Sequence, residues 1–449
     1  MDLQALQVEG FADRGIGRYA AAFTTAMAAR GRVAAALLAP ELPPPSGLPR
    51  RLVTDDLVRW DGVATMREVL AGRGKIVHHS LAPFLHCGPT DPSVLTVAPH
   101  WAGAGCPRVA TLYDLIPLRA GRHYLSAPGA VERYRSRAGW VATADLILAI
   151  SEHTRSEAIE LLGCEPARVV NVGAGVGSYF APPDGTDEEL FRHHLGRWHD
   201  RPFLLCVTGS DARKNTERLI EAAGLLSRRG VDIGLVVVGH LTESWVDRLR
   251  QVAQAAGVAD RMDLTGSVSD ELLRACYRRA ELTVMPSLSE GSGLPVLESA
   301  ACGTAAAASG TTALAEVTAT ALAQFDPTDP ESIADCLQSL IGDPERRRAV
   351  VEAQAKLASG SSWGAVADVA ARAYDDLAER LPGSSWSSPS AVRQSLLFAG
   401  PVRPEGGGIS PFNDRLLRLL GERLDSTVVT DTATMGGKGP AGKGPVAAS

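Results

Sequence analysis

Short apolar runs alternate with longer segments of mixed polarity along the first 180 residues. Runs of this length are typical of buried strands, and the intervening segments are long enough for helices. Strands that alternate with helices indicate βαβ units and a parallel sheet. The predicted strands are residues 3–8, 33–39, 76–79, 109–115, 146–150 and 169–172.

The pattern restarts after residues 181–202, a polar and proline-containing segment that we interpret as a linker. The strands predicted beyond it are residues 203–208, 233–238, 262–265, 282–285 and 305–308. The sequence therefore predicts an α/β protein with two Rossmann-like parallel-sheet domains, residues 1–180 and 203–380. Two such domains place a ligand in the cleft between them, at the carboxyl ends of strands.

The stretch EGSGLPVLE, which begins at residue 290, connects a predicted strand to a helix that should start at Pro295. Gly291 and Gly293 let the backbone approach a ligand, and free N–H groups at a helix start can bind phosphate. Glu290 and Glu298, the latter in the first helical turn, could then accept hydrogen bonds from hydroxyls of a nucleotide sugar. The alternative is a solvated acid at 290 and a helix-dipole partner at 298.

Three further charged side chains follow predicted strands. Arg213 and Lys214 lie in the loop GSDARKN, which begins at Gly209, and would supply donors and positive charge against a diphosphate. A solvated basic turn is the alternative. Asp114 ends an apolar strand of the first domain, where it must either bind loop backbone or face a ligand.

Two glycine-containing loops complete the candidates. The segment Gly15-x-Gly17-x-x-Ala20 matches a dinucleotide fingerprint, although the preceding strand should end about six residues earlier than the fingerprint requires. A tight turn is the other interpretation. Gly266 opens a loop before a helix whose predicted N-cap is Ser269.

The composition of the chain narrows the class of protein to which it can belong. A net charge of -6 gives no global electrostatic case for nucleic acid binding. The seven cysteines are scattered without a C-x-x-C pair, which favours reduced thiols in a cytoplasmic protein. Neither a secretory signal nor an apolar run long enough for a membrane span is visible. The histidines lack companion ligands at metal-binding spacing, so no metal site is expected.

Six arginines lie between residues 108 and 137. They could face lipid phosphates or a phosphorylated acceptor, but a solvated helix face is the simpler interpretation.

Taken together, residues 2–380 resemble a retaining glycosyltransferase of family four, with the two-domain GT-B fold of bacterial polysaccharide-building, mannosyltransferase-like enzymes. The most specific feature is the E-x7-E spacing of Glu290 and Glu298. The segments GIGRY, LYDLIPL, SEHTRSEA, GSDARKN and FDPTDP support it, in the order that the family has.

The resemblance implies an acceptor domain followed by a donor domain, whose last helix could pack back on the first. It implies that Glu290 contacts the transferred sugar, Glu298 holds the ribose, and Arg213 and Lys214 bind the leaving diphosphate. Asp114 would join them as a catalytic residue. The implied donor contacts are Gly15, Gly17, Gly209, Gly266, Val268, Gly291, Ser292, Gly293 and Leu294. Such enzymes need no bound metal, since cations and a helix N-terminus neutralise the leaving charge.

One position departs from many relatives, which carry His-Asp where this chain has Tyr113-Asp114. Tyrosine can hydrogen-bond but cannot carry a proton as histidine does near neutral pH. Several polysaccharide-building relatives share the Tyr-Asp form, so the change does not imply inactivity.

The tail, residues 381–449, contains a segment at 395–425 that resembles the first strand, glycine loop and helix of another such transferase. We interpret it as the truncated start of a second unit. The Gly/Lys/Pro-rich end that follows should be disordered.

The leading hypothesis is a cytoplasmic enzyme that moves a hexose, with mannose suggested by the resemblance, from GDP-mannose or a UDP-sugar. The acceptor would be a growing surface polysaccharide or lipid-linked glycan, with peripheral contact at the inner membrane face. The alternatives are a nicotinamide-dependent oxidoreductase that uses Gly15 to Ala20, and a non-catalytic nucleotide-sugar binding protein.

Overall fold

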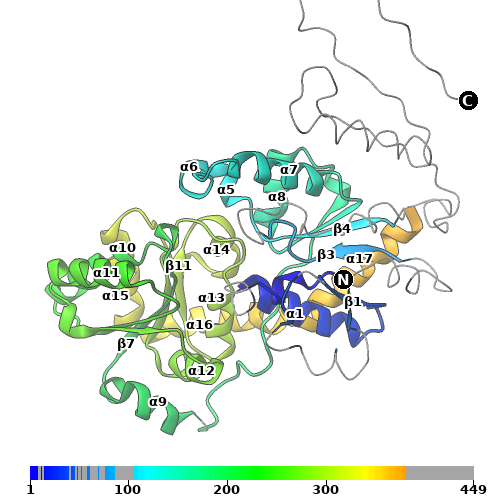
Figure 1. Cartoon of the computed structure of the whole chain (residues 1–449). Coiled ribbons are helices and arrows are strands. Elements are labelled where there is room, and N and C mark those ends of the chain that lie inside the picture. Colours follow the sequence, from blue (N-terminus) through cyan, green and yellow to red (C-terminus); the bar gives the residue numbers. More distant parts are fainter. Residues whose placement is uncertain are drawn as a thin grey trace, which may run out of the picture. The chain divides into compact units, whose positions relative to one another are not determined.

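The computed structural model describes residues 1–8, 12, 15–39, 42–45, 48, 52, 58–60, 69, 76–85, 106–185 and 187–380. These residues belong to one compact unit, Met1–Trp386, which contains two parallel α/β domains in sequence (Figure 1). The tail segment 395–425 and the Gly/Lys/Pro end lie outside the described residues.

The first domain is built on parallel strands. The order β3-β4-β5-β6 forms one sheet and β1-β2 another, and Asp2 bridges Leu37 of β1 and Ser80 of β3. The strands are β1 Ala36–Leu38, β2 Val58–Trp60, β3 His78–Ser80, β4 Arg108–Leu112, β5 Leu146–Ala149 and β6 Val169–Asn171. The helices are α1 Gly15–Ala28, α5 Ile116–Arg119, α6 Gly121–Tyr124, α7 Ala130–Ala142 and α8 Glu152–Leu162.

The second domain has one six-stranded parallel sheet with the order β12-β11-β10-β7-β8-β9. Its strands are β7 Phe203–Val207, β8 Gly234–Val238, β9 Met262–Gly266, β10 Leu282–Met285, β11 Ala306–Ser309 and β12 Gln324–Phe325. Its helices are α10 Thr216–Arg228, α11 Glu243–Ala256, α12 Asp270–Arg279, α13 Leu294–Ala301, α14 Thr312–Val317, α15 Pro330–Gly342, α16 Pro344–Gly360 and α17 Trp363–Arg380.

Most predicted strands are confirmed to within a few residues, but the strand predicted at 3–8 is wrong. There the carboxylate of Asp2 accepts a hydrogen bond from the Gln4 backbone N–H at 2.9 Å. This local bond turns the chain into the 3₁₀-helix Gln4–Leu6, because an aspartate side chain can compete with sheet hydrogen bonds for nearby backbone groups. Strands β2 and β12 were not predicted.

The last helix, α17, crosses to the first domain. Ala367, Ala370 and Tyr374 of α17 are buried in the same core as Phe23 of α1, and Figure 1 shows α17 in orange beside α1 in blue. The Tyr374 hydroxyl lies 2.7 Å from Nδ1 of the buried His79 of β3. None of the helices in the described part of the chain is long and apolar enough to cross a membrane.

The segment interpreted as a linker contains helix α9, Glu188–Leu195. Phe191 and Leu195 are buried in a core of the second domain, and the Phe191 ring stacks on Phe203 of β7 at 5.8 Å between centroids. Asp187, just before α9, accepts hydrogen bonds from Arg274 at 2.6 and 2.8 Å and from Arg278 at 2.6 Å. The segment is therefore fixed to α12.

We expect Asp187→Ala to lower the free energy of unfolding by about 3 kcal/mol, because it leaves a buried arginine without one of its partners. The hydrogen bond from Arg274 lowers the pKa of Asp187, so its stabilisation is present above the usual aspartate pKa of about 4 and fades as the pH falls below it. Denaturant unfolding at pH 7 and at pH 3 measures both effects. The control is Asp184→Ala, which removes an exposed partner of Arg278 and should lower stability by less than about 1 kcal/mol; equal losses in the two variants would contradict the prediction.

Candidate functional site

The site lies where the strand order of the second sheet reverses. Strands β7 and β10 are neighbours at the centre of this sheet. From β7 the chain continues to β8 toward one edge of the sheet, whereas from β10 it continues to β11 toward the other edge. Ligands of open α/β sheets bind at such a switch point, beyond the carboxyl ends of the strands. Here the loop after β7 holds Arg213, and the loop after β10 holds Glu290. The backbone N–H of Leu288 donates to the Arg213 carbonyl at 2.7 Å and joins the two loops.

Glu290 receives both cations of the β7 loop. Arg213 Nη1 donates to Glu290 Oε2 at 2.8 Å, and Lys214 Nζ donates to Oε1 at 2.6 Å. Burial opposes ionisation of Glu290, but Lys214 and Arg213 outweigh it and lower its pKa to about 2. The carboxylate is thus ionised at all ordinary pH values and holds the two cations side by side.

The glycine of the β10 loop touches the first domain. A Cβ added to Gly291 would lie 2.1 Å from the carbonyl oxygen of Tyr113 and 3.3 Å from Cβ of Asp114. Thr154 Oγ1, on α8, lies 3.1 Å from the Tyr113 carbonyl and 3.4 Å from the Gly291 carbonyl. Only a residue without a side chain permits this approach of the two backbones.

Asp114 completes this group of charges. It accepts a hydrogen bond from the Ile116 backbone N–H at 3.1 Å, as the loop-backbone interpretation predicts, and it also lies near Arg213 and Glu290. Burial raises the pKa of Asp114, while the Ile116 hydrogen bond and Arg213 act in the opposite direction. Asp114, Arg213, Lys214, Glu290 and Gly291 therefore converge at one point between the domains.

Glu298 lies apart from this group. Helix α13 begins at Leu294, with Gly293 as its N-cap at φ 86°, so Pro295 is the second helical residue. Glu298 is the fifth, so its predicted placement in the first turn is wrong by one residue; the left-handed Gly293 lets the helix start earlier than expected. The Tyr277 hydroxyl donates to Glu298 Oε2 at 2.8 Å. Burial raises the pKa of Glu298, against the effects of the Tyr277 hydrogen bond and the charge of Arg18.

Most of the remaining predicted residues lie in α1 and in or beside the loops after β7 and β9. Gly15 and Gly17 are inside α1 rather than in a turn after a strand, so they do not form the dinucleotide fingerprint. Gly266 ends β9 at φ 71°, and the Ser269 side chain accepts from the Leu272 N–H as the predicted N-cap of α12. Gly209 and Val268 occupy the loops after β7 and β9.

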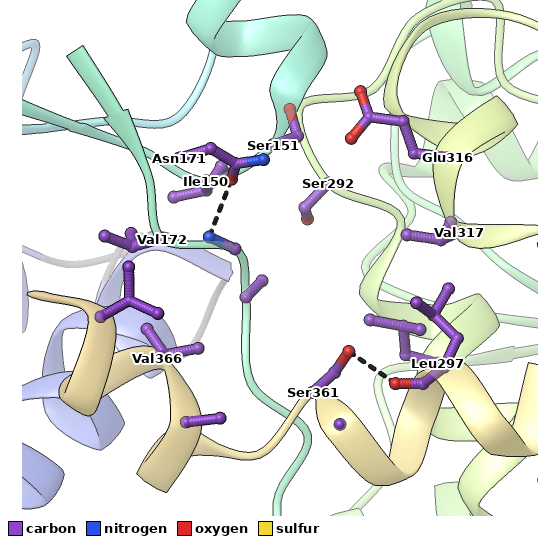
Figure 2. A pocket seen from close by; sticks show the side chains of 16 residues that line it. Ile150, Ser151, Asn171, Val172, Ser292, Leu297, Glu316, Val317, Ser361 and Val366 are labelled. Carbon is purple, nitrogen blue, oxygen red and sulfur yellow. Dashed lines mark hydrogen bonds between the residues drawn. The ribbon is translucent and has the colours of Figure 1, made fainter. Parts of the chain in front are cut away.

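Ser292 lines a cavity of about 220 Å³ behind the β10 loop, together with Ser151, Asn171 and Glu316 (Figure 2). Glu316 of α14 accepts hydrogen bonds from the backbone N–H groups of Glu152 at 3.0 Å and His153 at 2.6 Å. These groups belong to the first turn of α8, so a carboxylate of the second domain occupies the positive end of a first-domain helix.

Several contacts of the site were not predicted. Tyr277 reaches Glu298 from α12, and Arg18 of α1 pairs with Asp270 at the start of α12. Asp211 accepts a hydrogen bond from Arg213, and Tyr124 donates to Asp211. Asp211 lies inside the quoted loop GSDARKN, but no local pattern reveals the tertiary partners. In the described ranges, no three His, Cys, Asp or Glu side chains lie together as a metal ion would require.

Two parallel α/β domains with a site at the second sheet's switch point define the GT-B class of glycosyltransferase folds. The structure of Anabaena HepE in complex with UDP and glucose is similar, with a TM-score of 0.59 and 14% identity over 80% of this chain and 96% of that one. Residues 187–357 match the family model described as Glycosyl transferases group 1, and the domain that they form belongs to this family. The predicted α/β class and GT-B fold are confirmed, and the predicted glycosyltransferase family is confirmed for the domain that holds residues 187–357.

Curated relatives agree with this assignment. The serotype-specific mannosyltransferase WbdA of Escherichia coli is 30% identical over 293 residues, which are 64% of this chain and 36% of WbdA. D-inositol 3-phosphate glycosyltransferase of Thermobifida fusca (strain YX) is 32% identical over 260 residues, 56% of this chain and 59% of the relative. The chain thus spans between about a third and three fifths of the length of these relatives.

Proposed function

We propose that this chain transfers a hexose from a nucleoside-diphosphate sugar to an acceptor hydroxyl, with retention of configuration. The observation that carries the proposal is the convergence of Arg213 and Lys214 on Glu290, beside the start of α13. Two cations and a helix N-terminus suit a leaving diphosphate, and a carboxylate suits sugar hydroxyls.

In this proposal the bond between the anomeric carbon and the diphosphate oxygen breaks, and the acceptor oxygen bonds to that carbon on the same face. The acceptor proton passes to the departing phosphate, so no protein nucleophile is required. Arg213 and Lys214 stabilise the charge that develops on the diphosphate. Glu290 orients both cations and accepts hydrogen bonds from the sugar, with Asp114 facing it from the first domain.

Glu298 would hold the ribose, because its carboxylate lies at the Arg18 and Tyr277 side of the cleft, away from the Glu290 group. The further donor contacts in the proposal are Gly15, Gly17, Gly209, Gly266, Val268 and the backbone of residues 291–294. The base would then lie near the loop after β9.

The proposed donor and acceptor are inferred from the relatives that this chain resembles. Similarity to WbdA supports mannose, whereas HepE was solved with UDP and glucose, so both GDP- and UDP-sugars belong in the test. A surface polysaccharide or lipid-linked glycan is the proposed acceptor, with the enzyme in the cytoplasm and at the inner membrane face.

A panel of nucleotide sugars tests the function. GDP-mannose, GDP-glucose, UDP-glucose and UDP-galactose are incubated with methyl α-mannoside or with water alone, and release of the nucleoside diphosphate is measured. We expect turnover with one donor and a rise in melting temperature with its nucleoside diphosphate. A thermal shift with a nicotinamide dinucleotide and with no nucleotide sugar would instead support the oxidoreductase alternative.

Removal of divalent metal should change this turnover less than about twofold, because Arg213, Lys214 and the helix start supply the positive charge that a metal would otherwise bring to the diphosphate. The measurement is the rate of nucleoside diphosphate release in EDTA, with and without added Mg²⁺ or Mn²⁺. A large loss in EDTA that either metal restores would contradict the proposed charge balance.

A further inference from the structure

A first-domain tyrosine reaches into the β7 loop of the second domain. Tyr124 ends the short helix α6, and its hydroxyl donates to Asp211 Oδ1 at 2.8 Å. Tyr124 is 37% exposed, so the contact lies at the open rim of the cleft rather than in a core. The hydrogen bond therefore exists only while the two domains are close together.

Asp211 in turn holds Arg213. Its Oδ1 accepts from the Arg213 backbone N–H at 3.0 Å, and its Oδ2 accepts from Arg213 Nε at 3.0 Å. The opposite edge of the same guanidinium, Nη1, donates to Glu290 at 2.8 Å and to the Ser289 carbonyl at 2.9 Å. A planar guanidinium that is hydrogen-bonded at both edges has one orientation, and Asp211 binds one of these two edges.

A carboxylate beside a diphosphate site needs a reason, because it repels the ligand. The cost is offset if the carboxylate fixes a donor that binds the transition state, since preorganised donors contribute more to catalysis than mobile ones. Burial and then the Asp211 hydrogen bond raise the pKa of Tyr124, so the phenol stays protonated and donates to Asp211 at neutral pH.

We propose that Tyr124 and Asp211 are positioning residues through which closure of the first domain orients Arg213 toward the leaving diphosphate. The inference rests on the proposed function and deepens it: the second domain alone would bind the nucleoside diphosphate, but Arg213 would reach its working orientation only when Tyr124 engages Asp211. Neither residue needs to touch the substrate.

The test compares wild type, Tyr124→Phe, Asp211→Asn and the double variant, with the nucleotide sugar that the panel selects. We expect kcat to fall about 3- to 5-fold in Tyr124→Phe and about 10-fold or more in Asp211→Asn, while the Kd of GDP or UDP changes less than about 3-fold. Because both substitutions interrupt one chain of contacts, the double variant should match Asp211→Asn within about twofold rather than show the product of the two losses. The control is Asp335→Asn on α15, which removes the same charge from an exposed carboxylate that pairs with Arg229 and should leave kcat unchanged.

The outcomes separate this inference from the proposed function. Wild-type kcat in both single variants, multiplied losses in the double variant, or a loss explained by unfolding at the assay temperature would overturn the positioning role while the transferase activity stands. Tighter diphosphate binding in Asp211→Asn with unchanged kcat would show a purely electrostatic role and also overturn it. A wild-type protein that neither binds nor turns over any donor would overturn the proposed function, and this inference with it.

Discussion

Lys214→Ala is expected to lower the turnover of the nucleotide sugar by about 10²- to 10³-fold, because it removes a positive charge from the position where the leaving diphosphate develops charge. The Lys214 Nζ lies 2.6 Å from Glu290 Oε1 and only a fifth of the side chain is exposed, so water can replace little of its effect. The Kd of the free nucleoside diphosphate should rise about 10-fold, as expected for one lost charge-assisted hydrogen bond. Initial rates of diphosphate release and calorimetric titration measure the two quantities.

The chain offers a matched control in Lys356, an exposed lysine on α16 away from the β7 and β10 loops. Lys356→Ala should keep the wild-type rate and Kd. Lys214→Arg should recover part of the lost rate, because it restores the charge with a different shape. Equal rates for Lys214→Ala and wild type would show that transfer does not need the pair of cations, because Arg213 alone would then suffice.

The second domain could be predicted more fully than the first because its strands are longer and end at loops with distinctive residues. Strands β7 and β8 are continuous apolar runs, buried along nearly their whole length, and such runs identify central parallel strands. At the N-terminus the predicted strand 3–8 carries Gln4 and Gln7 among its apolar residues, and the Asp2 carboxylate diverts it into a 3₁₀ turn. The polar side chain before this segment therefore decided its local structure.

The segment interpreted as a linker contains structure that its average polarity did not predict. Residues 181–202 are polar on average, yet Phe191, Leu195 and Trp198 are buried against the second domain, and Asp187 is held by two arginines. The average polarity of a segment does not reveal an amphipathic helix in which polar residues outnumber apolar ones. Asp187 and its partners on α12 are about ninety residues apart in the chain, so no local pattern can predict that they pair.

The candidate site was accessible from sequence only as far as its loops are contiguous. The spacing of Glu290 and Glu298 and the pair Arg213-Lys214 can be read from the printed letters. That Glu290 bonds the cations while Glu298 bonds Tyr277 depends on the neighbouring positions of β7 and β10 and on the packing of α12. The sequence therefore predicts which residues are candidates, whereas their division into two groups requires the fold.

Gly291→Ala is expected to lower turnover by about 10²-fold, because a misplacement of about 1 Å between reacting groups has that effect. A Cβ at residue 291 would lie 2.1 Å from the Tyr113 carbonyl oxygen, and both sides of this contact are backbone, which cannot rotate away as a flexible side chain can. The first domain must then move back from the loop, and Asp114 with it. The Kd of the nucleoside diphosphate should change less than about 3-fold in this variant, because the cations of the second domain remain in place.

Gly342→Ala provides the matched substitution, since a Cβ at that last residue of α15 would meet nothing within 4 Å. It should leave rate and affinity unchanged. If Gly291→Ala loses diphosphate binding as strongly as turnover, the alanine has displaced the β10 loop and its Glu290 rather than the first domain. If it keeps the wild-type rate, the approach of the two backbones is not needed for transfer, and Asp114 would have no role that depends on a closed cleft. A selective loss of turnover would place the first domain within reach of the reacting atoms, as an acceptor-binding domain must be.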